Sequence, residues 1–359
     1  MNIRNDEFYF YPATIKDNAD IDALLRNPDF KGDLQILYTR GKNPVESFYK
    51  DGDETLILCC RHKNTDSLAG FGVCNVSNMY IGGRLEKVAY LSGLRVSPDF
   101  RRKTLRLIDA YSIMMDWISE NGAKYIITTI LSDNEVFQKL VSKKRKNFPE
   151  YMRIADYRVW IIPRVRPFKK IITGIRPIRK NEIDALKSFY YKYGKDFYLY
   201  PELDFDNLDY KNFRIVSEGD EILCALYLKS RSDKKQILHA YEGKYAYIKY
   251  IRHLLPLYGY PVLPAEGREL DYRYVSYYLC KPGEEEMLSN LILDAAMEDS
   301  KINYIAVGCI NGSKVDEYLK RSIKMSYNSI LYTVAAEDSC YSEELVENAN
   351  SIYLELSVL

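Results

Sequence analysis

The order of strand-like and helix-like segments occurs twice along this chain, which limits the chain to folds built from two similar units. In each half a β-hairpin is followed by a third strand, a long helix, a buried strand, a short helix and a closing strand. The four residues Ile21–Leu24 recur as Ile183–Leu186. A length of 359 residues also fits two domains of roughly 100–200 residues each. We therefore expect two modules, at residues 1–165 and 172–359, joined by a linker that contains proline and glycine.

The spacing of apolar residues predicts the elements of each module. In the first half we expect strands at 54–61, 68–77, 87–96, 124–131 and 152–162, and helices at 104–121 and from about 133 to 141. In the second half we expect strands at 212–217, 221–229, 273–280, 303–310 and 329–335, and helices at 287–299 and 312–321. Thr104 is a candidate cap for the long first helix, and Ser132 or Asp133 for the short one. Alternating strands and helices predict the α/β (α+β) class.

Composition excludes several classes of protein. Lys and Arg total 51 and Asp and Glu total 50, so the net charge of +1 argues against a globally basic nucleic-acid binder. No apolar run approaches ~18 residues, and the first residues do not resemble a signal peptide, so we expect no membrane partner. The seven cysteines form no CxxC pair, which favours reduced, buried thiols and a cytoplasmic location. The three histidines are not spaced for a metal, and we expect none.

The segment Leu91–Leu140, which begins LSGLRVSPDFRRKTLRLIDAY, resembles the GNAT superfamily of N-acetyltransferases. In that family a strand splays away from its neighbour, ends in an Arg/Gln-x-x-Gly-x-Gly/Ala loop and leads into a helix. The second half resembles the same superfamily more faintly, through RYVSYYLC and the helix after it. The resemblance implies two GNAT-like modules, each a mixed, mostly antiparallel sheet flanked by helices.

The resemblance also implies a site for acyl-CoA in the first module. Leu94, Arg95 and Val96 would face the pantetheine arm, and Asn134 would lie near the thioester. The pyrophosphate would lie at a helix N-terminus, where free N–H groups and the helix dipole favour anions. The residues of this phosphate loop would be Arg101, Arg102, Lys103, Thr104, Leu105 and Arg106. The loop departs from the family pattern, because Thr104 and Arg106 stand where small residues are usual.

The function that follows from the resemblance is an N-acyltransferase that uses acyl-CoA, with acetyl-CoA as the expected co-substrate. The acceptor would be a primary amine of a small molecule or peptide. The catalytic base and acid are not identified: Glu86 and Glu135 are the nearest carboxylates, and the short helix has no Tyr. The alternative is a non-catalytic tandem GNAT-like protein that binds a partner or metabolite. The oligomeric state stays open. The basic run at 143–146 either contacts the 3′-phosphate of the cofactor or is a solvated surface.

Three features of the second half complete the expectations. Its strand-to-helix connection is acidic at Glu284–Glu286, which predicts a module without a phosphate loop. The aromatic segment Ser188–Phe205 either lines an acceptor cleft or packs between the modules. The final residues, SIYLELSVL, alternate as a strand does. In a few tandem GNAT proteins the C-terminal carboxylate acts as a base, which is the other reading of Leu359.

Overall fold

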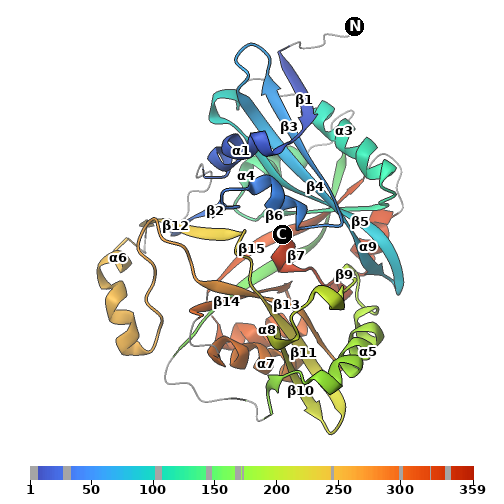
Figure 1. Ribbon diagram of the computed structural model, residues 1–359, viewed down its shortest axis with the longest axis vertical. Helices are drawn as coiled ribbons and strands as arrows, with labels where there is room; N and C mark the ends of the chain where they lie inside the picture. Colours follow the sequence, from blue (N-terminus) through green and yellow to red (C-terminus); the bar gives the residue numbers. More distant parts are fainter. Residues whose placement is uncertain are drawn as a thin grey trace.

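A twisted sheet runs through the length of the molecule, and helices lie on both of its faces (Figure 1). The computed structural model describes residues 7–26, 34–101, 107–142, 148–165, 171, 174–243, 246–298, 302–323, 325–335 and 341–359. The elements of the first half are β1 (Phe8–Pro12), α1 (Asn18–Leu25), β2 (Leu34–Thr39), α2 (Pro44–Tyr49), β3 (Glu54–His62), β4 (Leu68–Ile81), β5 (Arg84–Val96), α3 (Leu107–Glu120), β6 (Tyr125–Leu131), α4 (Glu135–Val141) and β7 (Glu150–Pro163). Those of the second half are β8 (Arg176–Pro177), α5 (Ile183–Gly194), β9 (Tyr200–Pro201), β10 (Phe213–Glu218), β11 (Glu221–Lys229), β12 (Lys235–Tyr241), α6 (Ile248–Ile251), β13 (Tyr272–Cys280), α7 (Glu285–Glu298), β14 (Tyr304–Ile310), α8 (Lys314–Ser322), β15 (Ser326–Ala335) and α9 (Tyr341–Glu347).

The predicted class is confirmed, and the strands and helices expected from periodicity all occur to within a few residues, except at the end of the chain. The last residues do not form a strand: Leu356–Val358 is a short 3-10 helix. The repeated tetrapeptides both lie in the helix that opens a half, Ile21–Leu24 in α1 and Ile183–Leu186 in α5. The proposed Thr104 cap lies outside the described residues.

The two halves exchange their closing strands. The order along the sheet is β1-β3-β4-β5-β6-β15-β7-β14-β13-β11-β10-β8, with β9 on β4. Thus β15, from the second half, pairs with β6 of the first, and β7, from the first half, pairs with β14 of the second. Periodicity places a closing strand correctly along the chain but does not say which neighbour it joins. The module boundary near residue 170 remains a prediction, and hydrogen-bonded strands cross it.

Alternating side chains of the strands serve separate clusters on the two faces of the first half. Along β3, Leu56 and Leu58 pack with α3, whereas Ile57 and Cys59 pack with α1 and α2. Strand β14 is buried along its whole length, as a strand covered on both faces should be. The described cysteines are all free, as expected, and Cys280 alone among them is not fully buried. Cys340 lies outside the described residues.

Strand β5 separates from β6 halfway along its length. The parallel pairing of the two strands ends at Leu91 and Thr128. Beyond this point β5 follows β4 through a bulge, where Gly93 has φ +65°, and β6 follows β15. A Cβ at Gly93 would also lie 3.0 Å from Cγ2 of Val73. Glycine therefore permits the bulge that opens a V-shaped split in the sheet.

The second half has a split of the same form. The pairing of β13 with β14 ends at Tyr274 and Ala306, and a bulge follows on β13. Here Tyr277, with φ +53°, stands where the first half has Gly93. The repeat in the sequence is thus a repeat of this splayed arrangement.

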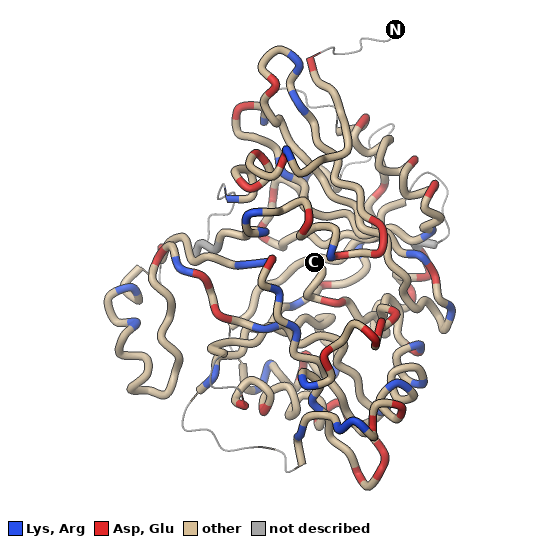
Figure 2. Tube along the Cα trace, viewed as in Figure 1, with Lys and Arg blue, Asp and Glu red and all other residues tan. Residues whose placement is uncertain are grey.

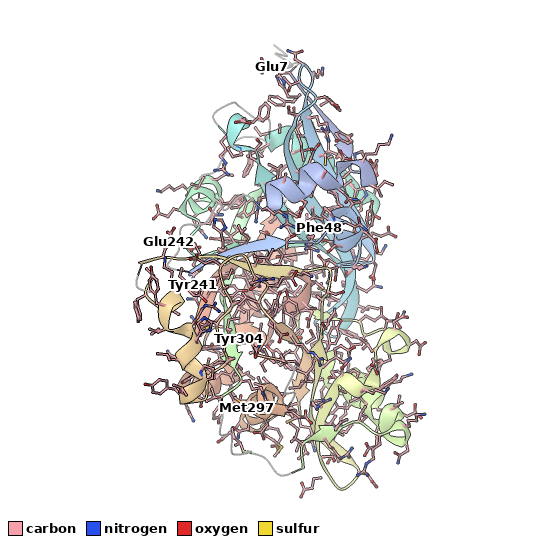
Figure 3. All side chains as sticks on the ribbon, turned by 60° about the vertical axis from the view of Figure 1, so that its left-hand side comes forward. Glu7, Phe48, Tyr241, Glu242, Met297 and Tyr304 are labelled. Carbon is pink, nitrogen blue, oxygen red and sulfur yellow. The ribbon has the colours of Figure 1, made fainter. Side chains whose placement is uncertain are left out.

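A small second sheet, separate from the long one, joins the two halves. It consists of β2 and β12, which run antiparallel and lie side by side (Figure 3). Figure 2 shows Lys and Arg interspersed with Asp and Glu over most of the molecule, in line with the near-balance of charge. Strand β2 ends at Thr39, and the next residue, Arg40, is buried.

Candidate functional site

A cavity of about 740 Å³ occupies the split of the first half. One wall is β5 from Tyr90 to Val96, and the facing wall is β6 and the start of α4, from Thr128 to Asn134. The cavity continues between the strands and α3 on one side and toward β2 and the end of the chain on the other. It is thus a passage through the sheet, with two ends of different character.

Four of the residues predicted from the GNAT resemblance lie on this cavity. Leu94, Arg95 and Val96 form the β5 wall, and Asn134 lies opposite them. Arg101 is described but is not part of the wall; its Nε donates to the carbonyl of Val96 at 3.3 Å. The rest of the expected phosphate loop lies outside the described residues: Arg102, Lys103, Thr104, Leu105 and Arg106. The same is true of the basic run at 143–146.

Asn134 caps α4. Its side-chain oxygen accepts a hydrogen bond from the backbone N–H of Phe137 at 3.2 Å. The sequence prediction of Ser132 or Asp133 as the cap was wrong by one or two residues, because Ser, Asp and Asn stand in a row and are similarly good caps. The cap fixes Asn134 where β6 turns into the helix, so its position on the cavity wall is set by the local fold.

The end of the cavity toward α3 is apolar. Phe10 and Leu58 from the strands lie on the same side of the sheet as Ala110 and Met114 of α3, and all four line it. On β4 the wall has no side chain at Gly70 and Gly72. Periodicity predicted the strands at 54–61 and 68–77 and the helix at 104–121, and only the structure reveals that the space between them is hollow.

The split closes on a pair of hydroxyl groups. Tyr90 Oη and Thr129 Oγ1 lie 2.7 Å apart, bridging β5 and β6. Burial raises the pKa of Tyr90 to about 12, so the phenol is protonated at neutral pH and is available as a donor. Both residues line the cavity. With 33 tyrosines in the chain, no sequence signal distinguished this one.

The opposite end of the cavity contains the last residue of the sequence. Leu356 and Leu359 line it, together with Tyr38 and Tyr274. The main-chain oxygen of Leu359 accepts a hydrogen bond from Lys234 Nζ at 2.5 Å, and Ser357 O accepts another at 3.1 Å. The expected terminal strand was therefore wrong: this segment turns inward and ends beside a buried lysine.

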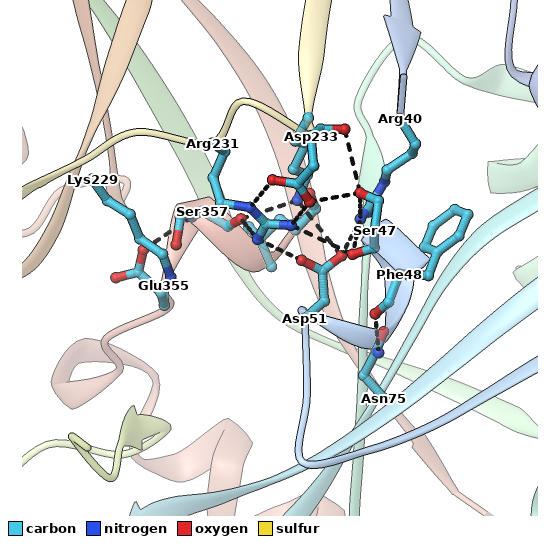
Figure 4. A network of polar contacts seen from close by, with 12 residues as sticks. Arg40, Ser47, Phe48, Asp51, Asn75, Lys229, Arg231, Asp233, Glu355 and Ser357 are labelled. Atoms are coloured by element: carbon cyan, nitrogen blue, oxygen red, sulfur yellow. Dashed lines mark hydrogen bonds and ion pairs between the residues drawn. The ribbon is translucent and has the colours of Figure 1, made fainter. Parts of the chain in front are cut away.

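A buried network of charges holds this end of the cavity in place (Figure 4). Asp51 pairs with Arg40 at 2.5 Å and with Arg231 at 2.7 Å, and Lys234 Nζ lies 4.0 Å from it. Burial by itself would raise the pKa of the Asp51 carboxyl, but the three cations outweigh that effect and lower it. Burial lowers the pKa of Lys234 well below its usual value, against the attraction of Asp51. Asp51 is therefore ionised at neutral pH.

The network joins segments that are distant in sequence. Arg231 also pairs with Asp233 at 2.7 Å, and Asp233 accepts from the Ser47 hydroxyl at 2.8 Å (Figure 4). Residues from α2, from the connection between β11 and β12, and from the end of the chain thus meet at one point. The charged residues of this network have no sequence signal, because each of them by itself is typical of a solvated surface.

The split of the second half is filled by the chain itself. Tyr278 of β13 donates its hydroxyl to the carbonyl of Gly308 on β14 at 2.7 Å. The buried carboxylate of Glu355 lies beside the bulge and accepts four hydrogen bonds. The donors are Ser276 Oγ at 2.7 Å, the Tyr277 backbone N–H at 3.1 Å, Tyr353 Oη at 2.6 Å and the Ser357 backbone N–H at 3.0 Å. The terminal segment thus occupies, in the second half, the place that is a cavity in the first.

Other candidates from the sequence lie elsewhere. Glu86 is outside the cavity wall and pairs with Arg84 and Lys124, and Glu135 pairs with Lys139 on the surface. The aromatic segment Ser188–Phe205 contributes to a packed cluster and not to the cavity, which favours the packing alternative. Within the described ranges no group of His, Cys, Asp and Glu is arranged to hold a metal. None of the described helices has the length and apolar content needed to span a bilayer.

Comparison with known proteins shows similarity in structure only. No family model and no curated protein matches the sequence. Among solved structures, Saccharomyces cerevisiae N-myristoyltransferase with bound myristoyl-CoA matches with a TM-score of 0.58 at 12% identity, over 97% of this chain and 90% of that one. A GCN5-related N-acetyltransferase from Sphaerobacter thermophilus matches with a TM-score of 0.55 at 11% identity, over 91% and 95%.

Proposed function

We propose that this chain, which has the GNAT fold in two modules, is an N-acyltransferase that takes its acyl group from acyl-CoA. The observation that carries the proposal is the cavity in the split between β5 and β6. On this stretch β5 has no partner strand on the side of β6, so its main chain faces the cavity and not a neighbouring strand. An extended pantetheine arm can add to such an edge as a further strand would.

The proposed substrate contacts follow the resemblance. Leu94, Arg95 and Val96 would bind the pantetheine arm, Asn134 would lie near the thioester, and the loop from Arg101 to Arg106 would bind the pyrophosphate. In the reaction the amine nitrogen attacks the thioester carbonyl carbon. The C–N bond forms, the C–S bond breaks, the nitrogen loses a proton to give the neutral amide, and the CoA thiolate takes up a proton and leaves as the thiol. Tyr90 is the donor that we propose for charge developing at the thioester.

We propose an acyl group longer than acetyl, although acetyl-CoA is the co-substrate expected from sequence. The space between β4 and α3 is apolar and opens directly off the split. An acetyl group needs no such space, whereas each buried methylene group of a longer chain contributes about 0.8 kcal/mol. The acceptor amine would then enter at the other end, where the main-chain oxygen of Leu359 and the hydroxyl of Tyr38 can orient it.

Calorimetric titration of the wild-type chain with acetyl-, octanoyl- and myristoyl-CoA tests the binding. We expect one site per chain, with affinity that increases with acyl length. Reversal of charge at Arg101 and Arg102 (Arg101→Glu with Arg102→Glu) should lower the affinity by at least tenfold. Arg26→Glu, on the surface in α1's C-terminal turn, is the matched control and should bind as wild type does. No heat with any of the three at millimolar concentration would contradict the proposal.

The role of Tyr90 has a separate test. Tyr90→Phe removes only the hydroxyl, so we expect kcat for acyl transfer to fall about 100-fold with little change in acyl-CoA affinity. Tyr111→Phe is the control, since Tyr111 of α3 also lines the cavity but its hydroxyl pairs with that of Tyr151 on β7. Equal rates for the two variants would exclude Tyr90 as the donor.

A further inference from the structure

A segment between β12 and β13 projects from the edge of the molecule (Figures 1 and 3). We refer to residues Tyr247–Val262 as the outer segment; it comprises α6 and the 3-10 helix Arg252–Tyr258. Of the nineteen large hydrophobic residues that are exposed in the described part of the chain, eight lie here. Leu257 is 79% exposed, and Tyr250 and Tyr258 are each 75% exposed. This is a concentration of apolar surface that a protein surrounded by water rarely presents.

Hydrogen bonds to backbone carbonyls within or next to the outer segment hold its shape. The Arg252 guanidinium donates to the carbonyl of Leu263 at 3.0 Å, which ties the start of the 3-10 helix to the stretch of chain that follows it. Gly259, at φ +81°, ends the 3-10 helix, and the N–H of Tyr260 bonds to the carbonyl of Leu255 at 3.2 Å. The apolar side chains are thus displayed on a folded scaffold, and they do not pack together into a core of their own.

The charge of the outer segment has one sign. It carries Lys249 and Arg252, and no Asp or Glu occurs from Ala246 to Ala265. Figure 2 shows the contrast with the rest of the molecule, where both signs alternate. The nearest carboxylates, Glu242 and Glu266, lie at the base of the segment. An exposed surface of Tyr, Leu and Ile whose charged residues are all cations is complementary to a negatively charged lipid surface.

We propose that the outer segment binds the surface of a membrane that contains anionic lipids. Tyr side chains are enriched at the level of the lipid headgroups, since the ring is apolar and the hydroxyl is polar. Leu254 and Leu257 reach toward the acyl chains, and Lys249 and Arg252 lie near lipid phosphates. The absence of a long apolar run in the sequence excludes a span but not a segment that lies on the bilayer. This inference is independent of the proposed acyl transfer.

Co-sedimentation of the full chain with extruded vesicles tests the proposal. We expect binding to phosphatidylcholine vesicles that contain about 30% phosphatidylserine, weaker binding to pure phosphatidylcholine, and a decrease between 50 and 500 mM salt. Leu257→Glu should lower the partition coefficient at least tenfold, and Lys249→Glu severalfold. Ile15→Glu, at a residue 78% exposed outside the segment, and Lys192→Glu, beside Tyr193 on α5, are the matched controls and should bind as wild type does.

Three results would overturn the proposal. The first is absence of sedimentation with anionic vesicles at low salt. The second is an equal loss in Leu257→Glu and Ile15→Glu, which would mean a general effect of added negative charge. The third is self-association through this surface. It would be shown by a dimer in analytical ultracentrifugation that Leu257→Glu dissociates, with no vesicle binding by the wild type or the variant.

Discussion

Replacement of Gly72 by leucine is expected to lower the affinity for myristoyl-CoA about 30- to 150-fold and to leave the melting temperature near that of the wild type. Gly72 lies on β4 at the apolar end of the cavity. A Cβ there would lie 3.0 Å from Cε of Met114, the free end of a flexible side chain that can move aside. The rest of the leucine would then occupy cavity space, excluding three or four methylene groups of a substrate at about 0.8 kcal/mol each, a loss of roughly 2–3 kcal/mol.

The comparison with shorter substrates makes this prediction specific. Acetyl-CoA should lose much less affinity than myristoyl-CoA, because its acyl group does not reach the space near Met114. Ser77→Leu, on the same strand but outside the cavity wall, is the control and should bind both as the wild type does. Calorimetry gives the affinities and a thermal melt gives the stability. Unchanged myristoyl-CoA affinity in Gly72→Leu would show that this part of the cavity does not hold the acyl chain.

Asp51→Asn is expected to lower the free energy of unfolding by about 3–5 kcal/mol, because it leaves buried cations without their shared carboxylate. Arg40, Arg231 and Lys234 surround Asp51, and the side chains of all four are nearly inaccessible to solvent. Glu135→Gln breaks a pair on the surface and should change the free energy by no more than about 0.5 kcal/mol. Urea denaturation with an unchanged m-value measures both. A loss below about 1 kcal/mol in Asp51→Asn would mean that the cations find other partners.

The lowered pKa of Asp51 predicts how the free energy of unfolding depends on pH. The pKa of Asp51 is lowered in the folded state, so its contribution is fully present above the unfolded value, about 3.9, and is lost as the pH falls through the lowered folded value. The wild type should therefore lose stability more steeply than Asp51→Asn on acidification below about pH 4. Urea denaturation midpoints of the wild type and Asp51→Asn at a series of pH values measure this difference.

Much of the fold can be predicted from the sequence because local signals agree with the final structure. The apolar run of β14 is that of a strand buried on both faces, and the repeated order of elements gives two splayed units. The exchange of β7 and β15 is not predictable in this way, because their alternation fits either neighbouring sheet equally well. The terminal segment was misjudged for a related reason: Tyr353 and Glu355 alternate as in a strand but fill the second split.

The candidate site likewise has parts that the sequence predicts and parts that it does not. Leu94, Arg95, Val96 and Asn134 were expected from the resemblance of Leu91–Leu140 to the GNAT superfamily, and all four line the cavity. The ion network could not, since Asp51 and Arg231 are 180 positions apart and only the fold brings them together. The volume of the cavity also has no sequence signal, because the residues that line a hollow core and those that fill one are of the same types.

The exchanged strands have a consequence for how the protein is made. On β6, Ile127 is paired with Thr333 of β15, so the first half cannot complete its sheet until the residues of β15 have left the ribosome. Contacts between such distant positions slow folding, since a long loop must close before they form. During synthesis the edge of β6 stays open to other strands, and this chain is expected to depend on chaperones over that interval.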